Sequence, residues 1–326
     1  MFNDFDYYNN AGIEMRSILS RYGYDGTVLS QKVIPFPNLF TGAHYFPSIY
    51  EYLPVEPLKA ASAVVQENIK IIYSKFANCS EVVMNVMLFS NGKLPGDTSL
   101  LEYGKEWIRP MMEKTQPKKM LFIPFAMIRG QYSDRTQQLQ QVFDEYDCEV
   151  VSIHEAEDPV QALKEVDGII ISGGNTWVLN RMLHDLGLVI PMRDAVINKG
   201  KLFIGWSAGT NVATPTIRTT NDMPIVSAAI LPALILCPFQ INPHYIEASI
   251  SGHMGETRDE RIEEFLCMNP SEVVVGIPEG TMLQVCEGKL TYHTATGKPM
   301  KLFKHGQLAE TFTADSDLAF LMDIGC

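Results

Sequence analysis

The feature that most constrains the fold is an alternation of short apolar runs and helical patterns that begins at Met84. The apolar runs predict buried strands, and the amphipathic stretches predict the helices between them. The expected strands are 84–89, 119–125, 149–153, 167–172 and 201–206. The expected helices are 98–114, 134–147, 158–166 and 176–199, the last broken near Gly187. Strands that alternate with helices in this way form a parallel sheet with right-handed crossovers, so the sequence predicts an α/β domain.

The C-terminal part of the chain changes to a different pattern. One more amphipathic helix is expected over 259–268. Short β runs then follow one another, at 272–277, 281–286, 289–293 and 300–304. No internal repeat or linker separates them from the preceding elements, so we assign residues 84–326 to one domain.

Residues 1–83 form a separate N-terminal extension, which holds 14 of the chain's 32 aromatic side chains. Flexible tails are poor in aromatic residues, so we expect most of the extension to be ordered. Helices are expected at about 11–21 and 57–77, with a proline-rich connector between them. The extension carries no chemical motif. We expect it to pack over the following domain or against a second subunit, which would give a homodimer.

Charge and cysteine usage restrict the partners. The chain has 38 acidic and 26 basic residues, and a net charge of −12. This balance argues against binding to nucleic acid or to an anionic membrane, which needs Lys and Arg to neutralise phosphates. The six cysteines lack CxxC pairs, which favours reduced thiols over a disulfide framework or a zinc site. With no signal peptide or apolar run long enough for a membrane span, we expect a cytoplasmic protein.

Two strand–helix junctions carry the chemistry, because function in such sheets collects where strands end and helices begin. Gly173-Gly174-Asn175-Thr176 follows the strand 167–172, and its glycines let the backbone approach a ligand. An ordinary tight turn would have the same sequence. Gly205-Trp206-Ser207-Ala208-Gly209 follows the strand 201–206 and has the G-x-S-x-G pattern of a nucleophile elbow.

A serine nucleophile needs a base, and the base needs a third group to orient it. Of the seven histidines, His244 follows an apolar run and a proline, where the end of a strand is expected. Asp222 lies in a polar turn and could supply the acid. From the residues alone, a histidine in this context is more often a surface or structural residue than a base, and an aspartate in a polar turn is more often a capping residue.

Long runs of this sequence resemble the dipeptidase E family, the α-aspartyl dipeptidases. The central runs are GWSAGTNVATPTIRTTNDMPIV (205–226), FQINPHY (239–245) and GHMGETRDERI (252–262). The resemblance extends from LFSNGKLPG (88–96) to IPEGTMLQV (277–285), and so covers roughly residues 84–310. It implies the flavodoxin-like fold of class I glutaminase-like enzymes, a three-layer α/β fold with a mostly parallel sheet. Residues 1–83 have no counterpart in the compact members.

The resemblance also implies a site. The family's catalytic serine, aspartate and histidine fall on Ser207, Asp222 and His244. The oxyanion donors fall on the backbone N–H groups of Gly174 and Ala208. The substrate-binding arginine falls on Arg258, and we place Glu256 and Asn175 beside the substrate with it. The implied reaction is hydrolysis of dipeptides with an N-terminal aspartate through an acyl-enzyme, without metal or cofactor.

The same residues are compatible with three other functions. A glutaminase-type amidotransferase would carry cysteine at position 207, where this chain has serine. A cyanophycinase-like hydrolase of aspartyl polymers also uses serine on this fold, but the continuous match over 205–262 favours the dipeptidase. An inactive binding module of the same fold is disfavoured by the presence of Ser207, Asp222 and His244.

Overall fold

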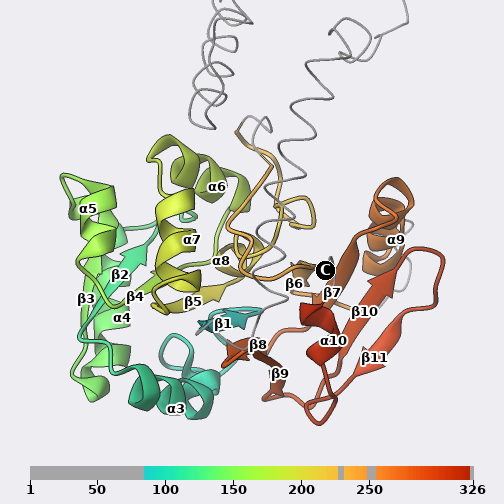
Figure 1. Ribbon diagram of the computed structural model, residues 1–326, viewed down its shortest axis with the longest axis horizontal. Coiled ribbons are helices and arrows are strands. Elements are labelled where there is room, and N and C mark those ends of the chain that lie inside the picture. The colour runs from blue at the N-terminus through green and yellow to red at the C-terminus, as the bar shows by residue number, and fades with distance from the viewer. Residues whose placement is uncertain (1–83, 227–230, 248–254, 324–326) are drawn as a thin grey trace, which may run out of the picture. The chain divides into compact units, whose positions relative to one another are not determined.

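The computed structural model describes residues 84–226, 231–247 and 255–323 (Figure 1). The helices expected over 11–21 and 57–77 lie outside these residues. The five expected strands are confirmed as β1 (Asn85–Phe89), β2 (Lys119–Ile123), β3 (Glu149–Ser152), β4 (Gly168–Ile171) and β5 (Leu202–Trp206). Nearly all of their residues are buried, which is why they read as continuous apolar runs.

These strands form most of a seven-stranded sheet with the order β3-β2-β4-β5-β1-β8-β9. The pairs among β1 to β5 are parallel. The last two strands, β8 (Thr281–Cys286) and β9 (Lys289–Thr294), add antiparallel neighbours beyond β1. The run β3-β2-β4-β5 repeats the 2-1-3-4 order of a flavodoxin, so the expected flavodoxin-like α/β fold is confirmed.

Helices cover both faces of this sheet, because alternate residues of each strand point to opposite sides. Met87, Phe122 and Ile204 pack with α3 (Lys105–Thr115) and α4 (Tyr132–Phe143). The opposite face packs with three helices, which are α5 (Pro159–Lys164), α6 (Thr176–Asp185) and α7 (Val189–Ile197). The result is the predicted arrangement of three layers (Figure 1).

The break expected near Gly187 separates α6 from α7. Gly187 has a φ of +66°, in the left-handed region that favours glycine. Its N–H donates to the carbonyl of His184, and the N–H of Leu188 donates to that of Leu183. This pair of hydrogen bonds is a Schellman motif, which satisfies the last carbonyls of α6 before the chain turns into α7.

A second, four-stranded sheet has the order β11-β10-β7-β6. The sequence predicts β7 (Val273–Ile277) and β10 (Met300–Lys304), but not β6 (Gln240–Pro243), β11 (Glu310–Phe312) or a separate sheet. The predicted helix is confirmed as α9 (Arg258–Met268), whose Ile262 and Leu266 pack on this sheet. Residues of both sheets share one hydrophobic core.

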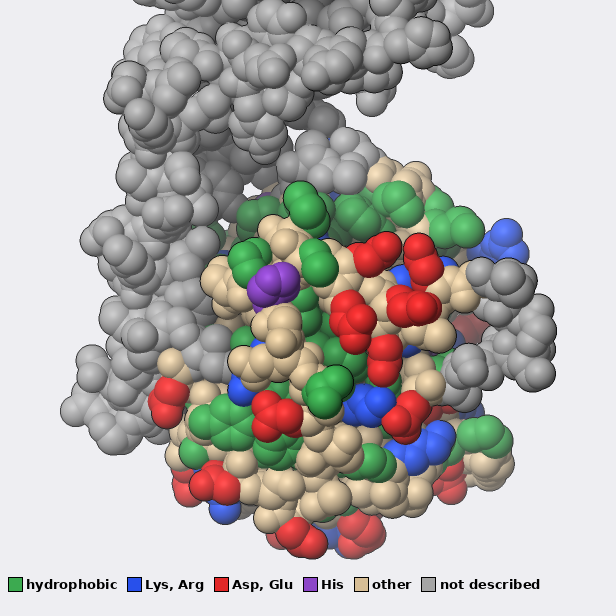
Figure 2. Space-filling model, turned by 90° about the vertical axis from the view of Figure 1, so that its right-hand side faces the viewer, with side chains coloured by type: hydrophobic (Ala, Val, Ile, Leu, Met, Phe, Trp, Pro, Cys, Tyr) green, Lys and Arg blue, Asp and Glu red, His purple; other side chains and the backbone are tan. Residues whose placement is uncertain are grey.

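The remaining described elements are single turns, namely η3 (Glu102–Gly104), η4 (Asp144–Tyr146), η5 (Ile153–Glu155), α8 (Ala208–Asn211) and α10 (Ala319–Met322). Among the described residues, no helix combines the length and apolar character that crossing a membrane requires. The side of the molecule that carries α9, β10 and β11 shows acidic and hydrophobic side chains close together (Figure 2). Glu260, Glu263 and Glu264 of α9 are exposed and contribute acidic charge to the surface of that helix.

Candidate active site

Ser207 occupies the sharp turn between β5 and α8. Its φ and ψ are +54° and −110°, a conformation that costs a non-glycine residue of order 1–3 kcal/mol. A Cβ at Gly205 would lie 2.7 Å from the carbonyl oxygen of Gly209, and one at Gly209 would lie 2.3 Å from that of Ile171. The two glycines of the pattern are therefore required by close backbone approach, as in a nucleophile elbow.

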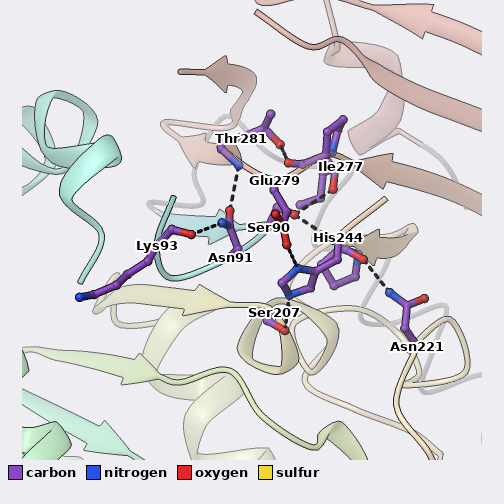
Figure 3. Close-up of polar contacts among 12 residues, drawn as sticks. Ser90, Asn91, Lys93, Ser207, Asn221, His244, Ile277, Glu279 and Thr281 are labelled. Carbon is purple, nitrogen blue, oxygen red and sulfur yellow. Dashed lines mark hydrogen bonds and ion pairs between the residues drawn. The ribbon is translucent and has the colours of Figure 1, made fainter. Parts of the chain in front are cut away.

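His244 faces Ser207 from the other sheet, one residue after β6 (Figure 3). Its Nε2 lies 2.9 Å from Ser207 Oγ, within hydrogen-bond distance. The predicted pairing of Ser207 with His244 therefore has the contact that a nucleophile and its base need. His244 itself has a φ of +53°, again in the left-handed region.

Glu279 contacts the other ring nitrogen of His244, where the sequence prediction places Asp222. Its Oε1 lies 2.7 Å from His244 Nδ1, in the turn that follows β7 (Figure 3). A carboxylate at Nδ1 places a proton on that nitrogen and leaves Nε2 free to accept the serine proton. The sequence prediction missed Glu279, although Glu279 is the acidic residue of the run IPEGTMLQV (277–285), where the resemblance to the family continues.

Asp222 lies elsewhere, so its expected contact with His244 is corrected. Its carboxylate accepts hydrogen bonds from Thr176 N–H (2.8 Å), Thr176 Oγ1 (2.6 Å) and Thr220 Oγ1 (3.0 Å). The Asp222 carbonyl also accepts from Trp177 Nε1. The turn that carries Asp222 lies against the first residues of α6, where a negative charge is favoured by the unpaired N–H groups of the helix.

Gly174, one of the two predicted oxyanion donors, lies in a turn packed against the elbow. A Cβ at Gly173 would lie 3.0 Å from Ser207 Cβ, so this turn is adjacent to the serine. Gly174 has a φ of +142°, and a Cβ there would lie 2.1 Å from the Ala126 carbonyl oxygen. Only glycine fits this position.

The other predicted donor, Ala208, is the first residue of α8. Within the described residues, neither the Gly174 nor the Ala208 N–H donates to a backbone acceptor. Asn175, predicted beside the substrate, instead caps α6. Its Oδ1 accepts from Val178 N–H, and its Nδ2 donates to the Met223 carbonyl.

Arg258 is the first residue of α9 and lies inside the capping box that Thr257 and Glu260 form. Its guanidinium donates to Asn221 Oδ1, and Asn221 Nδ2 donates to the carbonyl of Pro243 at 2.8 Å. Pro243 precedes His244, so Arg258 is linked through Asn221 to the strand end that carries the histidine. Burial, aided by the nearby positive charge of Arg261, lowers the pKa of Arg258.

Glu256, also predicted beside the substrate, has a side chain that is 55% exposed. It lies 3.7 Å from Arg261 Nε, so its ion pair in the structure is with Arg261. No group of three or more His, Cys, Asp or Glu side chains among the described residues is arranged to hold a metal ion. The four described cysteines, Cys148, Cys237, Cys267 and Cys286, are free thiols.

A serine on a strained strand–helix turn, hydrogen-bonded to a histidine that contacts a carboxylate, is the arrangement of serine hydrolases. Residues 86–293 match the family model described as peptidase family S51. The chain therefore belongs to peptidase family S51, and it is a peptidase.

Named relatives agree with this membership. A protein named peptidase E from Nostoc sp. is 39% identical over 238 residues, which cover 73% of this chain and 96% of the relative. A peptidase E from Shigella flexneri serotype 5b is 40% identical over 228 residues, which cover 69% of this chain and 96% of the relative. The crystal structure of a peptidase from an acI-B1 Actinobacterium matches with a TM-score of 0.55 at 17% identity. That match covers 73% of this chain and 98% of the other, and it supports the fold.

Proposed function

We propose that this chain is a cytoplasmic serine peptidase that hydrolyses dipeptides with an N-terminal aspartate. The observation that carries the proposal is the connected line Glu279–His244–Ser207, with Arg258 attached to the same strand end through Asn221. The intact hydrogen bonds favour an enzyme over an inactive binding module of the same fold.

The proposed reaction uses these groups in sequence. His244 Nε2 takes the proton of Ser207 as its Oγ attacks the peptide carbonyl, and then delivers that proton to the leaving amine. Glu279 holds the imidazole and stabilises its charged form. The N–H groups of Gly174 and Ala208 donate to the tetrahedral oxyanion, where one donor is typically worth roughly 3–4 kcal/mol. A water molecule deprotonated by His244 then releases aspartate from Ser207.

Arg258 supplies the proposed specificity. The chain carries a net charge of −12, so an anionic side chain needs a local cationic group to bind. A guanidinium offers a planar fork that matches a carboxylate, and a neutral amide of the same shape cannot replace that carboxylate. We expect Asn-X to be disfavoured relative to Asp-X by about 2–5 kcal/mol in transition-state binding.

The test is kcat/KM for Asp-Leu, Asn-Leu, Glu-Leu and β-Asp-Leu, with wild type and Arg258→Ala. The expected result is a strong preference of the wild type for Asp-Leu and loss of that preference in Arg258→Ala. Arg261→Ala is the matched control, because Arg261 lies one turn further along α9 and pairs with Glu256. Equal rates for Asp-Leu and Asn-Leu in the wild type would contradict the specificity. Preference for β-Asp-Leu would instead favour the cyanophycinase-like alternative.

A further inference from the structure

We propose that Ser90 and Asn91 are positioning residues that hold His244 and Glu279 in line with Ser207. The inference rests on the proposed function, and it assigns a role to two residues that follow β1. Neither side chain needs to touch the substrate. Ser90 acts on the backbone of the histidine, and Asn91 acts on the turn that carries the glutamate (Figure 3).

Ser90 joins three segments through one hydroxyl group. Its side chain is 0% exposed. Ser90 Oγ accepts a hydrogen bond from His244 N–H at 2.8 Å and donates one to the Ile277 carbonyl at 2.9 Å. The N–H of Ser90 donates to the Thr281 carbonyl at 2.9 Å. The end of β1 is thereby tied to the residue after β6 and to the last residue of β7.

The His244 backbone needs this support because of its conformation. A positive φ is disfavoured for any residue with a Cβ, so the surrounding contacts must hold it. The bond from His244 N–H to Ser90 Oγ is one such contact. The next N–H, of Tyr245, donates to the same Ile277 carbonyl that accepts from Ser90. Since the direction of the imidazole follows from this backbone, losing the Ser90 hydroxyl would let Nε2 move away from Ser207.

Asn91 makes the corresponding contact with the glutamate turn. Its Oδ1 accepts from the N–H of Gly280 at 2.8 Å, and Gly280 directly follows Glu279. Gly280 has a φ of +80°, so the chain reverses at this point. Asn91 is itself held, because its carbonyl accepts from Tyr103 Oη at 2.6 Å and its Nδ2 donates to the Lys93 carbonyl. The peptide group after Glu279 is therefore anchored to β1.

The place of β1 in the sheet explains why Ser90 and Asn91 can contact the segments that carry His244 and Glu279. In the seven-stranded sheet, β1 lies between β5, which ends before Ser207, and β8, which begins after Glu279. The Ser207 N–H donates to the carbonyl of Phe89, the last residue of β1. The segment Phe89–Asn91 thus makes hydrogen bonds to the nucleophile, to the histidine and to the turn of the glutamate.

The experiment measures kcat and KM for Asp-Leu in Ser90→Ala and Asn91→Ala. Misplacing a catalytic group by about 1 Å can cost roughly 100-fold. We expect kcat to fall about 10- to 100-fold in each variant with KM within about threefold, because neither residue contacts Arg258. Ser90→Thr, which keeps the hydroxyl, should recover activity relative to Ser90→Ala.

The matched control is Ser172→Ala. Ser172 is 2% exposed and follows β4, and its Oγ has no hydrogen-bond partner among the described residues. It should keep a kcat near that of the wild type. A double variant separates positioning from general loss of structure. In a Glu279→Gln background, Asn91→Ala should lower kcat by less than about a further threefold, because Asn91 acts through the turn that carries Glu279 and such effects are not additive.

The experiments distinguish a failure of this inference from a failure of the proposed function. Activity in Ser207→Ala would overturn the proposed function. An inactive Ser207→Ala together with wild-type kcat in Ser90→Ala and Asn91→Ala would overturn only the positioning role. If Ser90→Ala does not fold, Asn91→Ala decides the question, and if neither folds the two residues are determinants of the fold and the inference is wrong. If the losses of kcat in the double variant with Glu279→Gln were fully additive, the positioning role would also be contradicted.

Discussion

At the scale of single residues, the site combines groups that the sequence identifies with one that it does not. Ser207 is recognisable because its turn requires small neighbours in a fixed pattern. Glu279 has no such signature, since it lies 35 residues beyond His244 and only the fold brings the two side chains together. Asp222 is recognisable as a polar turn residue, but a capping carboxylate and a triad carboxylate look alike in a sequence.

The nucleophile is tested first, by Ser207→Ala. The Ser207 side chain contacts His244 at the edge of the site, so its removal should leave the fold intact. Loss of a triad member can lower kcat by about 10⁴- to 10⁶-fold. The measurement is turnover of Asp-Leu, with labelling by a fluorophosphonate probe and circular dichroism as controls. Retention of more than a few per cent of the activity would remove Ser207 from this role.

The two carboxylates are distinguished by comparing Glu279→Gln with Asp222→Asn. Glu279→Gln should lower kcat by roughly 10³- to 10⁴-fold, because the amide no longer stabilises the imidazolium. Asp222→Asn should stay within about tenfold of the wild type, since the amide oxygen can still accept from Thr176 and Thr220. Steady-state kinetics with Asp-Leu decide between them. The opposite order of effects would restore Asp222 as the group that orients His244.

At the scale of elements, the parallel strands were predictable and the four-stranded sheet was not. Buried parallel strands are apolar on both faces, so β1, β2 and β5 stand out in the sequence. β6 has two buried amides instead, and the nitrogen of each donates to specific partners. Gln240 Nε2 donates to Glu272, and Asn242 Nδ2 donates to the Thr219 carbonyl. A strand whose polar groups are paired by distant residues has no periodic pattern that would identify it.

The contact between α3 and β9 gives a prediction about pH. The His293 ring lies 5.4 Å from the Trp107 ring, and burial lowers the pKa of His293. The folded chain therefore binds the proton more weakly than the unfolded chain, whose histidine titrates near about 6.5. The contribution of His293 to stability is present above that pH and is lost as the pH falls through the folded-state pKa.

Denaturant unfolding at pH 7.5 and at pH 5 measures this contribution. His293→Gln should reduce the loss of unfolding free energy between the two pH values, because glutamine does not titrate. His305→Gln is the control, since His305 is exposed in the turn after β10. A pH dependence identical in wild type and His293→Gln would show that another group is responsible.

At the scale of the whole molecule, the site is divided between two sheets. Ser207 follows β5 of the seven-stranded sheet, while His244 and Glu279 follow β6 and β7 of the four-stranded sheet. One hydrophobic core contains residues from both, including Leu121 and Ile171 on one side and Val275 and Leu302 on the other. The contact that the reaction needs therefore depends on the two sheets remaining packed together.

This arrangement predicts that activity and both sheets are lost in one cooperative step. A shared core leaves neither sheet with a separate set of apolar contacts, so partial unfolding of one exposes surface of the other. Hydrogen exchange can be followed by mass spectrometry at increasing urea. The exchange rates of β2 and β10 should rise over the same range of urea concentration, and activity should be lost over that range too. Leu302→Ala, which shortens a core side chain carried by the four-stranded sheet, should lower the unfolding free energy of both strands by a similar amount, about 2–5 kcal/mol. Exchange of β10 at lower urea than β2, with activity lost together with β10, would contradict this prediction. The two sheets would then be separate cooperative units, and the contacts from Ser207 through His244 to Glu279 would be lost before the seven-stranded sheet unfolds.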